Sequence, residues 1–281
     1  MKQVGLVLEG GGMRGLYTAG VIDVMLEHGF QPNIITATSA GTTFGVNLLS
    51  KQKGRVLRYN KRFIGNRNYI SLRSWLKTGN VVNTEFAYHL LPDKLDPFDN
   101  ETFKQQDTHF YATITNMRTG KAEYVRIDDC DKQIDLIRAS AALPILSQPV
   151  LWNGEEYLDG GLADNIPLDK CFELGCNKII LVLTQTAEYV KRDKLNIICR
   201  LWYPRRKKLL HTIAKRNENY KKRQKQIRRL EKDGKVFVIR PSKTVHIHRL
   251  EKNPKRLQEM YDLGYKDAQM CWDRLRKYLE K

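Results

Sequence analysis

The 281-residue sequence lacks long apolar runs. The longest runs, at 4–8 and 179–183, have five residues each, whereas a helix that crosses a membrane needs about 20. Glu9 interrupts the first run, which is therefore too short for the hydrophobic region of a signal peptide. We expect a cytoplasmic protein with no signal peptide and no transmembrane helix.

Cysteine is scarce, and its spacing does not suggest a metal site. No CxxC pair occurs, and the five cysteines are Cys130, Cys171, Cys176, Cys199 and Cys271. Disulfide frameworks use even numbers of cysteines, and structural metal sites use closely spaced ones. We therefore expect reduced thiols, no bound metal and no cofactor.

Acidic residues are absent from residues 28–84, which contain nine lysines and arginines. Residues 189–233 contain 17 basic residues against four acidic ones, a net charge of +13 out of +18 for the whole chain. Such asymmetry predicts contact with an anionic surface, either phospholipid headgroups or nucleic acid. The alternative is a basic helix face that contacts only water.

The apolar pattern predicts strands that alternate with helices. Strands are expected at residues 3–8, 34–38, 109–115, 122–127, 150–152, 157–158, 178–183 and 236–239. Helices are expected at residues 16–28, 40–49, 133–142, 167–174, 205–232 and 254–279, with short helices between 55 and 105. This alternation favours an α/β fold in which helices flank a mostly parallel sheet.

A glycine-rich turn, Gly10-x-Gly12-x-x-Gly15, joins the first predicted strand to the first predicted helix. The pattern matches a dinucleotide-binding fingerprint, but that fingerprint needs an acidic residue about 20 positions later, and residues 28–84 contain none. Consecutive glycines at a helix N-terminus can instead direct backbone N–H groups at an oxyanion, and Arg14 adds a positive charge. A third interpretation is a tight turn that only needs positive φ.

A second short motif, Ala37-Thr38-Ser39-Ala40-Gly41, lies between the second predicted strand and its helix. It fits the nucleophile elbow G-x-S-x-G except that alanine replaces the first glycine. The residues two before and two after the serine, Ala37 and Gly41, are expected to crowd each other, so both must be small. The elbow would raise the Ser39 hydroxyl above the sheet at a helix N-terminus.

A serine nucleophile needs a base, which in most hydrolases is histidine. None of the six histidines follows a strand in a glycine-rich turn. Asp159 does, because it precedes Gly160 and Gly161 directly after a predicted strand. An aspartate is a weak base unless it is desolvated or held close to the hydroxyl, and burial beside Ser39 would meet that condition.

Together these three motifs resemble the signatures of the patatin-like phospholipase family. The segments Arg138–Pro144 and Asn165–Pro167 also resemble family sequences. The resemblance covers residues 3–185 and implies a three-layer patatin-like fold for that catalytic domain. Residues 186–281 look like the basic C-terminal extension of a bacterial subfamily, mainly helical and packed on the same domain.

The resemblance also implies a site and a reaction. Ser39 would be the nucleophile and Asp159 its general base, forming a Ser-Asp dyad without histidine. The implied oxyanion-hole residues are Gly10, Gly11, Gly12, Arg14, Gly15 and Ala40, with N–H groups donated by Gly11, Gly12 and Ala40. The ester carbonyl of a lipid would be attacked, an acyl-serine would form, and water would release a fatty acid without any metal.

Three alternatives to a lipid acyl hydrolase remain. A nucleic-acid-binding protein could use the basic helix, but it would leave the three motifs unexplained. An acyltransferase on the same scaffold would pair the serine with a histidine, and no histidine is placed for it. A catalytically silent scaffold would not need both Ser39 and Asp159. We expect a lipid ester substrate, peripheral contact of residues 189–233 with anionic lipid at the inner membrane face, and no nucleic acid.

Overall fold

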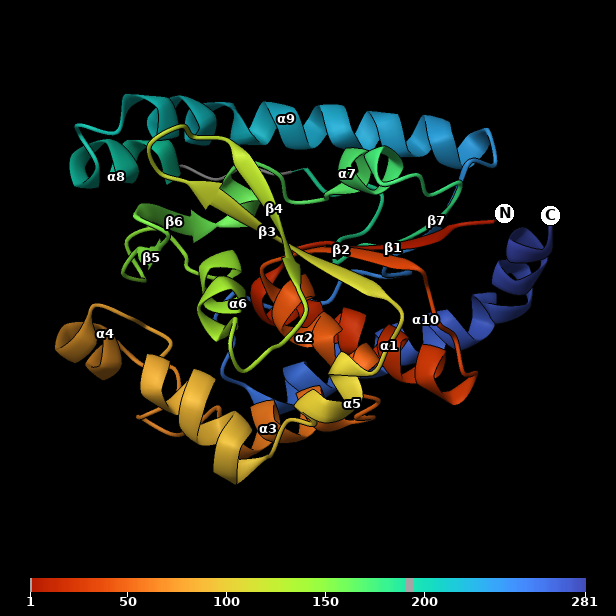
Figure 1. The fold of residues 1–281 in the computed structure, drawn as a ribbon, viewed down its shortest axis with the longest axis horizontal. Helices are drawn as coiled ribbons and strands as arrows, with labels where there is room; N and C mark the ends of the chain where they lie inside the picture. Colours follow the sequence, from red (N-terminus) through yellow and green to blue (C-terminus); the bar gives the residue numbers. More distant parts are fainter. Residues whose placement is uncertain (1, 191–194) are drawn as a thin grey trace.

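The computed structural model describes residues 2–190 and 195–281, and it confirms the predicted α/β fold. A sheet of eight strands lies between two layers of helices (Figure 1). The strands are β1 (Val4–Leu8), β2 (Ile34–Thr38), β3 (His109–Asn116), β4 (Ala122–Ile127), β5 (Val150–Trp152), β6 (Glu155–Asp159), β7 (Lys178–Val182) and β8 (Val236–Ile239).

The sheet order is β5-β6-β3-β2-β1-β7-β8, and β4 pairs with β3 outside this path. Strands β3, β2, β1, β7 and β8 are parallel, whereas β4, β5 and β6 form antiparallel pairs. In this register Leu8 of β1 lies beside Ala37 of β2 and Val182 of β7. The three carboxyl ends therefore meet at one sheet edge, where ligands bind in open α/β sheets.

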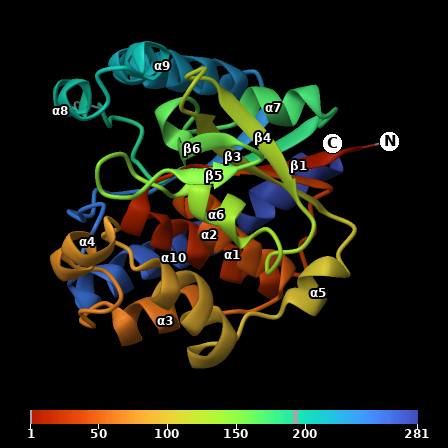
Figure 2. The same cartoon turned by 60° about the vertical axis from the view of Figure 1, so that its left-hand side comes forward.

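Helices cover both faces of the sheet (Figures 1 and 2). Helices α7 (Leu168–Glu173), α8 (Leu195–Trp202) and α9 (Lys207–Lys232) lie on one side. The other side carries α1 (Leu16–Glu27), α2 (Ala40–Leu49) and α10 (Pro254–Glu280), with α3 (Arg55–Phe63), α4 (Leu72–Thr78) and α5 (Asn100–Lys104) farther out. The remaining elements are α6 (Ile134–Ser140), the 3₁₀ turns η1 (Gly12–Gly15) and η3 (Gly160–Leu162), and the π-helix η2 (Phe86–Leu95).

The basic segment differs from its prediction in two ways. The long helix begins at Lys207 rather than at residue 205, and it is preceded by α8, which the apolar pattern did not predict. Pro204 separates the two helices, since proline cannot donate a helical hydrogen bond and restricts the residue before it.

The inner face of α9 is also more polar than its apolar stripe suggested. The predicted stripe of Ile213, Tyr220 and Ile227 is buried, but so are Arg216 and Gln224. Basic residues on this helix are therefore not all available to an external partner.

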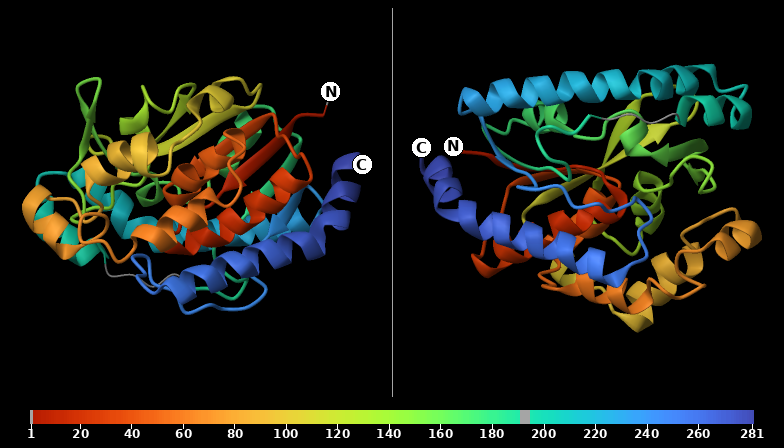
Figure 3. Two further views of the ribbon diagram at one scale, coloured as in Figure 1. Left: turned by 90° about the horizontal axis from the view of Figure 1, so that it is seen from below. Right: turned by 180° about the vertical axis from the view of Figure 1, so that it is seen from behind.

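The C-terminal segment belongs to the same sheet and core, because β8 pairs with β7 and α10 lies along α1 (Figure 3). The two helices approach through a pair of glycines. A Cβ on Gly264 would lie 2.1 Å from the Tyr17 carbonyl oxygen, and one on Gly20 would lie 2.2 Å from that of Tyr261. The predicted boundary between residues 185 and 186 does not coincide with a break in the sheet. No helix in the described ranges is both long enough and apolar enough to span a bilayer.

We predict that Gly264→Ala lowers the free energy of unfolding by about 1–3 kcal/mol, the usual cost of forcing extra atoms into a packed contact. The added methyl group would push α10 away from α1 at its closest approach. Urea denaturation measures the effect. Gly65→Ala is the matched control, because a Cβ there meets nothing within 4 Å. Equal stability of the two variants would contradict the close helix crossing.

Candidate active site

Ser39 occupies a strained turn between β2 and α2. Its backbone angles are φ 55° and ψ −122°, a region that residues with a Cβ rarely adopt. Its N–H donates to Ser140 Oγ at 3.0 Å, and its carbonyl oxygen accepts from the N–H groups of Thr42 and Thr43 at 2.9 and 3.0 Å. These contacts hold the elbow in its unusual conformation.

The end of β1 requires a small residue at position 41 of the elbow. A Cβ on Gly41 would lie 2.6 Å from the carbonyl oxygen of Leu8 and 3.0 Å from that of Glu9. The end of β1 therefore imposes the glycine at position 41. Ala37 lies fully buried within β2, where it pairs with Leu8 and Ala112 in ordinary strand geometry. This position does not require the conformational freedom of glycine.

The Ser39 hydroxyl donates a hydrogen bond to Asp159, with 2.7 Å between Oγ and Oδ2. The other carboxylate oxygen, Oδ1, accepts from the Gly161 N–H at 2.7 Å. Both side chains are buried, with 8 % of Ser39 and 3 % of Asp159 exposed. A Cβ on Gly160 would lie 2.2 Å from the Thr113 carbonyl oxygen, so the end of β6 can pack against β3 only with glycine at that position.

Burial raises the pKa of Asp159 above the ordinary aspartate value, because the charged form loses contact with water. The hydrogen bonds from Ser39 and Gly161 and the charges of Arg216 and Arg249 oppose this shift without cancelling it. The carboxylate beside Ser39 is therefore a stronger base than an exposed aspartate.

No histidine takes part in this pair. All six histidines lie in the described residues, and none donates to or accepts from Ser39 or Asp159. His89 lines the same cavity as Ser39, but its side chain makes no hydrogen bond there. Among hydrogen-bonded neighbours in the described ranges, Asp159 is thus the group that can accept the serine proton.

The glycine loop lies directly beside Ser39. Gly11, Gly12, Ala40 and Ser39 all line one cavity. In the described part of the chain, the N–H groups of Gly11, Gly12 and Ala40 make no backbone hydrogen bond. These three N–H groups are therefore candidates for binding an oxygen atom in the cavity. Gly12 has φ +59°, and a Cβ there would lie 2.5 Å from the Arg249 carbonyl oxygen.

The other predicted members of the oxyanion loop have supporting contacts. The Gly10 N–H donates to the Asn165 carbonyl oxygen at 3.1 Å, so it is not available to a ligand. A Cβ on Gly15 would lie 2.8 Å from that of Ala40, which makes this glycine necessary for packing loop and elbow together. Arg14 Nε donates to the Gly11 carbonyl oxygen at 3.2 Å and thereby shapes the loop.

Glu9 is a buried residue outside the three motifs. Its Oε2 accepts from the Thr184 N–H at 2.6 Å and hydroxyl at 3.1 Å. Its Oε1 accepts from Tyr220 Oη at 2.8 Å and Asn165 Nδ2 at 3.0 Å. This carboxylate therefore joins the glycine loop to β7, α9 and the segment after Asp159. The sequence feature that could have indicated this role is an acidic residue placed between a buried strand and a glycine turn.

Two further supporting residues were missed. Ser140, in the alanine-rich segment, binds the Ser39 N–H and lies 2.9 Å from Thr42 Oγ1. Arg216, on the buried face of α9, donates from Nε to the Gly161 carbonyl oxygen at 2.7 Å. Neither carries a local sequence signal, because each acts through a partner distant in the chain.

A cavity of about 350 Å³ opens at Ser39 and extends between α2, α3, η2 and α6. Its lining is mainly apolar or aromatic away from the serine: Phe44, Tyr59, Tyr69, Ile70, Leu91, Phe98, Ile134, Ile137 and Leu143. Near the glycine loop the lining is polar, with Arg14, Gln185, Arg216 and Arg249. Such a shape fits a ligand with one long apolar part and one polar part. No group of three or more potential metal-binding side chains occurs within the described residues.

Comparison with known sequences identifies the class. Residues 6–172 match the family model described as patatin-like phospholipase, and residues 206–280 match one described as Domain of unknown function (DUF6363). Because the first match covers more than half of the chain, the protein belongs to the patatin-like phospholipase family. The implied family membership is thus confirmed.

Individual relatives are more distant. The chain is 24 % identical over 276 residues to "Uncharacterized protein YjjU" of Escherichia coli K12, covering 93 % of this chain and 75 % of that protein. It is 30 % identical over 183 residues to "Lysophospholipase nte1" of Aspergillus niger, covering 64 % of this chain but only 12 % of that protein. Among solved structures, VipD from Legionella pneumophila aligns with a TM-score of 0.49 at 13 % identity, covering 98 % of this chain and 67 % of that one.

We predict that Ser39→Gly is more stable to urea than Ser39→Ala by about 1–3 kcal/mol, the strain of holding a Cβ in this backbone region. Both variants lose the hydroxyl, so their difference isolates the backbone. At ordinary helix or strand positions glycine is instead less stable than alanine by about 0.5–1 kcal/mol. A more stable alanine variant would show that the elbow is not strained.

Proposed function

We propose that this protein is a serine acyl hydrolase that cleaves carboxylic esters of lipids through a Ser39–Asp159 dyad. The observation that carries the proposal is the 2.7 Å contact between Ser39 Oγ and Asp159 Oδ2 in a buried site. Burial strengthens the base, and contact lets it accept the proton as Ser39 attacks. Membership of the patatin-like phospholipase family supports a lipid hydrolase.

The reaction has two halves. In the first, Ser39 Oγ attacks the ester carbonyl while Asp159 takes its proton, and the N–H groups of Gly11, Gly12 and Ala40 stabilise the oxyanion. Collapse of this intermediate returns the proton to the leaving alcohol and leaves an acyl-serine. In the second half, Asp159 takes a proton from water as the water oxygen attacks the acyl-serine. The bond between the acyl group and Ser39 Oγ then breaks, the proton passes from Asp159 to Ser39 Oγ, and the fatty acid leaves. Neither half needs a metal ion.

The cavity supports an ester of a long acyl chain. Its apolar part, lined by Tyr59, Leu91 and Phe98 among others, suits hydrocarbon, while its polar end lies beside the glycine loop. The relative named "Lysophospholipase nte1" matches 64 % of this chain, which also supports a lipid ester as the substrate. We include phospholipids and lysophospholipids in the proposed substrate class.

We propose different roles for residues 3–185 and 186–281, the first for chemistry and the second for support. Three contacts favour this division. Arg216 binds the Gly161 carbonyl oxygen, Tyr220 binds Glu9, and the Arg249 carbonyl oxygen accepts from the Met13 N–H at 3.0 Å. Each contact reaches a loop at the proposed catalytic site, so the C-terminal segment would hold those loops in position.

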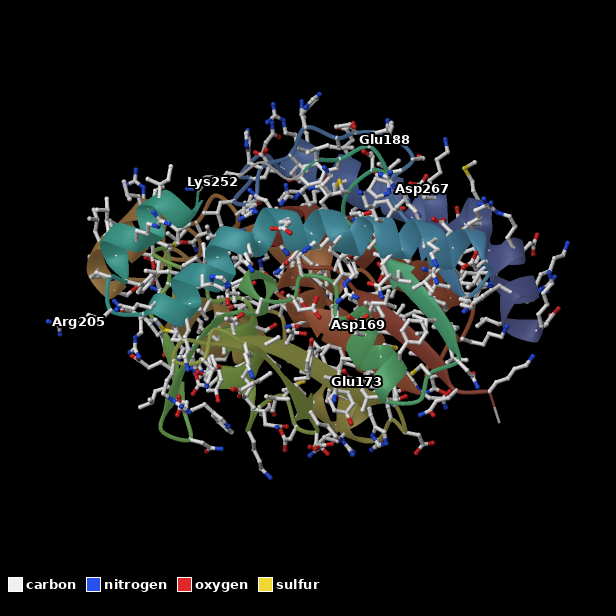
Figure 4. All side chains as sticks on the ribbon, turned by 90° about the horizontal axis from the view of Figure 1, so that it is seen from above. Asp169, Glu173, Glu188, Arg205, Lys252 and Asp267 are labelled. Carbon is white, nitrogen blue, oxygen red and sulfur yellow. The ribbon has the colours of Figure 1, made fainter. Side chains whose placement is uncertain are left out.

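The proposed contact between residues 189–233 and anionic lipid needs revision for α9. Arg223 is only 16 % exposed and pairs with Asp169 at 2.6 Å; Figure 4 shows Asp169 beside this helix. Arg216 also points inward. The basic side chains of α9 that are exposed to a lipid surface are those on its outer face, such as Lys221, Lys222 and Lys225.

We predict that Ser39→Ala and Asp159→Asn each reduce ester hydrolysis by about 10³-fold or more, because nucleophile and base act as one unit. The assay follows p-nitrophenyl ester and phospholipid hydrolysis by purified protein. For the same reason the double variant should be no slower than the slower single variant. His89→Ala is the control, since His89 lines the cavity without contacting the dyad. Near-normal turnover by either dyad variant would contradict the assignment.

We predict that Arg216→Met moves the acidic limb of the pH profile of kcat/KM to higher pH. The Arg216 charge lowers the pKa of Asp159, so its removal leaves the carboxylate protonated up to a higher pH, where it is no longer a base. Arg216→Lys retains a positive charge and should leave the limb nearer to its original position. An unchanged limb in Arg216→Met would show that Asp159 is not the titrating base.

A further inference from the structure

Large exposed apolar side chains gather on two short helices at one end of the molecule. On α4, Leu72 is 67 % and Leu76 is 71 % exposed. On α8, the exposed side chains are Ile197 (59 %), Ile198 (53 %), Leu201 (82 %) and Trp202 (54 %). Monomeric proteins rarely leave such clusters open, and clusters with a polar rim mark sites of protein or membrane interaction.

The two helices form one surface although 116 residues lie between Thr78 and Leu195 in the chain. The rings of Trp75 on α4 and Trp202 on α8 have centroids 6.5 Å apart. Leu76 and Trp202 also line a shared surface hollow. In Figures 1 and 2, α4 and α8 lie at the same end of the molecule, toward which β1 runs from the N label. We call these six residues (Leu72, Leu76, Ile197, Ile198, Leu201 and Trp202) the α4–α8 platform.

The platform has a basic rim. Neither helix contains an acidic residue, and their charged residues are Arg73, Lys77 and Arg200. Arg205 follows at the end of α9 nearest the platform, where Figure 4 labels it. Glu156, which borders the hollow between the helices, is already ion-paired with Arg206. The charge that α4 and α8 carry beside their apolar side chains is therefore positive.

The platform is connected to the Ser39 cavity by one loop. Leu143 lines the cavity, and two residues later Ile145 makes hydrogen bonds to Trp75 of α4 and to Tyr203, the residue directly after α8. The Ile145 carbonyl oxygen accepts from Trp75 Nε1 at 2.8 Å, and its N–H donates to Tyr203 Oη at 3.1 Å. Ile145 has φ 71°, an uncommon value for a β-branched residue. The two hydrogen bonds therefore hold the loop in a strained backbone conformation. A ligand on the platform would thus lie close to the segment that borders the cavity.

We propose that the α4–α8 platform docks this protein on a membrane surface that contains anionic phospholipid. The proposal rests on the proposed lipid hydrolase function, since docking there would bring ester substrate to the Ser39 cavity. Leucine and isoleucine would enter the acyl region, tryptophan would lie at the interface, and arginine and lysine would contact phosphate. The platform, rather than the outer face of α9, makes the primary contact.

Lipid fits this surface better than a second copy of the chain. In a symmetric dimer the same patch would face itself, bringing two basic rims together, and like charges across an interface are repulsive. A layer of anionic headgroups would instead neutralise the rim while burying the apolar centre.

The experiment measures binding to vesicles of phosphatidylcholine, with and without phosphatidylglycerol, by flotation of full-length protein. The double variant Leu76→Glu/Leu201→Glu places charge in the platform. Burial of a leucine side chain is worth enough that its loss weakens binding about tenfold, so we expect at least that loss for the double variant. Met270→Glu is the matched control, because Met270 is 72 % exposed on α10, a helix that contributes no residue to the platform. It should bind and hydrolyse like the wild type, and thermal unfolding verifies that both variants are folded.

The second measurement is the ratio of turnover on phosphatidylglycerol vesicles to turnover on a soluble p-nitrophenyl ester. This ratio should fall about tenfold in the double variant and stay constant in Met270→Glu. The Ser39→Ala variant separates docking from chemistry, because it should still bind vesicles. If the wild type binds vesicles through the platform but hydrolyses no ester, the proposed function is refuted and the docking proposal still stands.

Three results would overturn the docking proposal. One is undiminished vesicle binding by the folded double variant. Another is an equal loss of binding in Met270→Glu. The third is a dimer in lipid-free solution, seen by analytical ultracentrifugation, that the double variant converts to a monomer, since the platform would then be covered by a second copy.

Discussion

A carboxylate buried beside a serine hydroxyl is the interaction on which the rest of this structure depends. An isolated charge of this kind is costly to remove from water, so the fold must supply donors for each oxygen of Asp159. Ser39 supplies one and the Gly161 N–H supplies the other, at 2.7 Å each. The tight turn at Gly160 and Gly161 is the local consequence, because a side chain at position 160 would collide with β3.

A second buried carboxylate shows how environment separates two roles. Glu9 accepts from Thr184, Tyr220 and Asn165, whose donors occupy both of its oxygens, and it lies directly before the glycine loop. It acts as a structural link between β1, β7 and α9. Asp159 instead faces a hydroxyl in a cavity, and burial raises its pKa. Two buried carboxylates thus have different roles: Glu9 links structural elements, whereas Asp159 is a candidate base.

The basic charge of the chain is divided between two tasks. Part of it lies inside, where Arg216 binds the Gly161 carbonyl oxygen and Arg223 pairs with Asp169. The first contact connects α9 to the turn after Asp159, and the second connects it to α7. The remainder lies outside, and at one end it surrounds exposed leucine, isoleucine and tryptophan side chains. The net charge alone therefore does not predict which surface binds an anionic partner, because burial decides which basic side chains can contact that partner.

The sequence by itself determined the α/β alternation, the three motifs and, through them, Ser39, Asp159 and the glycine loop. Each of these depends on neighbours in the chain: strand periodicity, a turn that needs glycine, and a serine before a helix. The hydrogen bond between Ser39 and Asp159, the brace at Glu9, the inward Arg216 and the exposed surface of α4 and α8 were decided only by the tertiary structure. The physical reason is that these features join residues 55 to 211 positions apart, or depend on which helix faces remain uncovered, and local pattern carries no information on either.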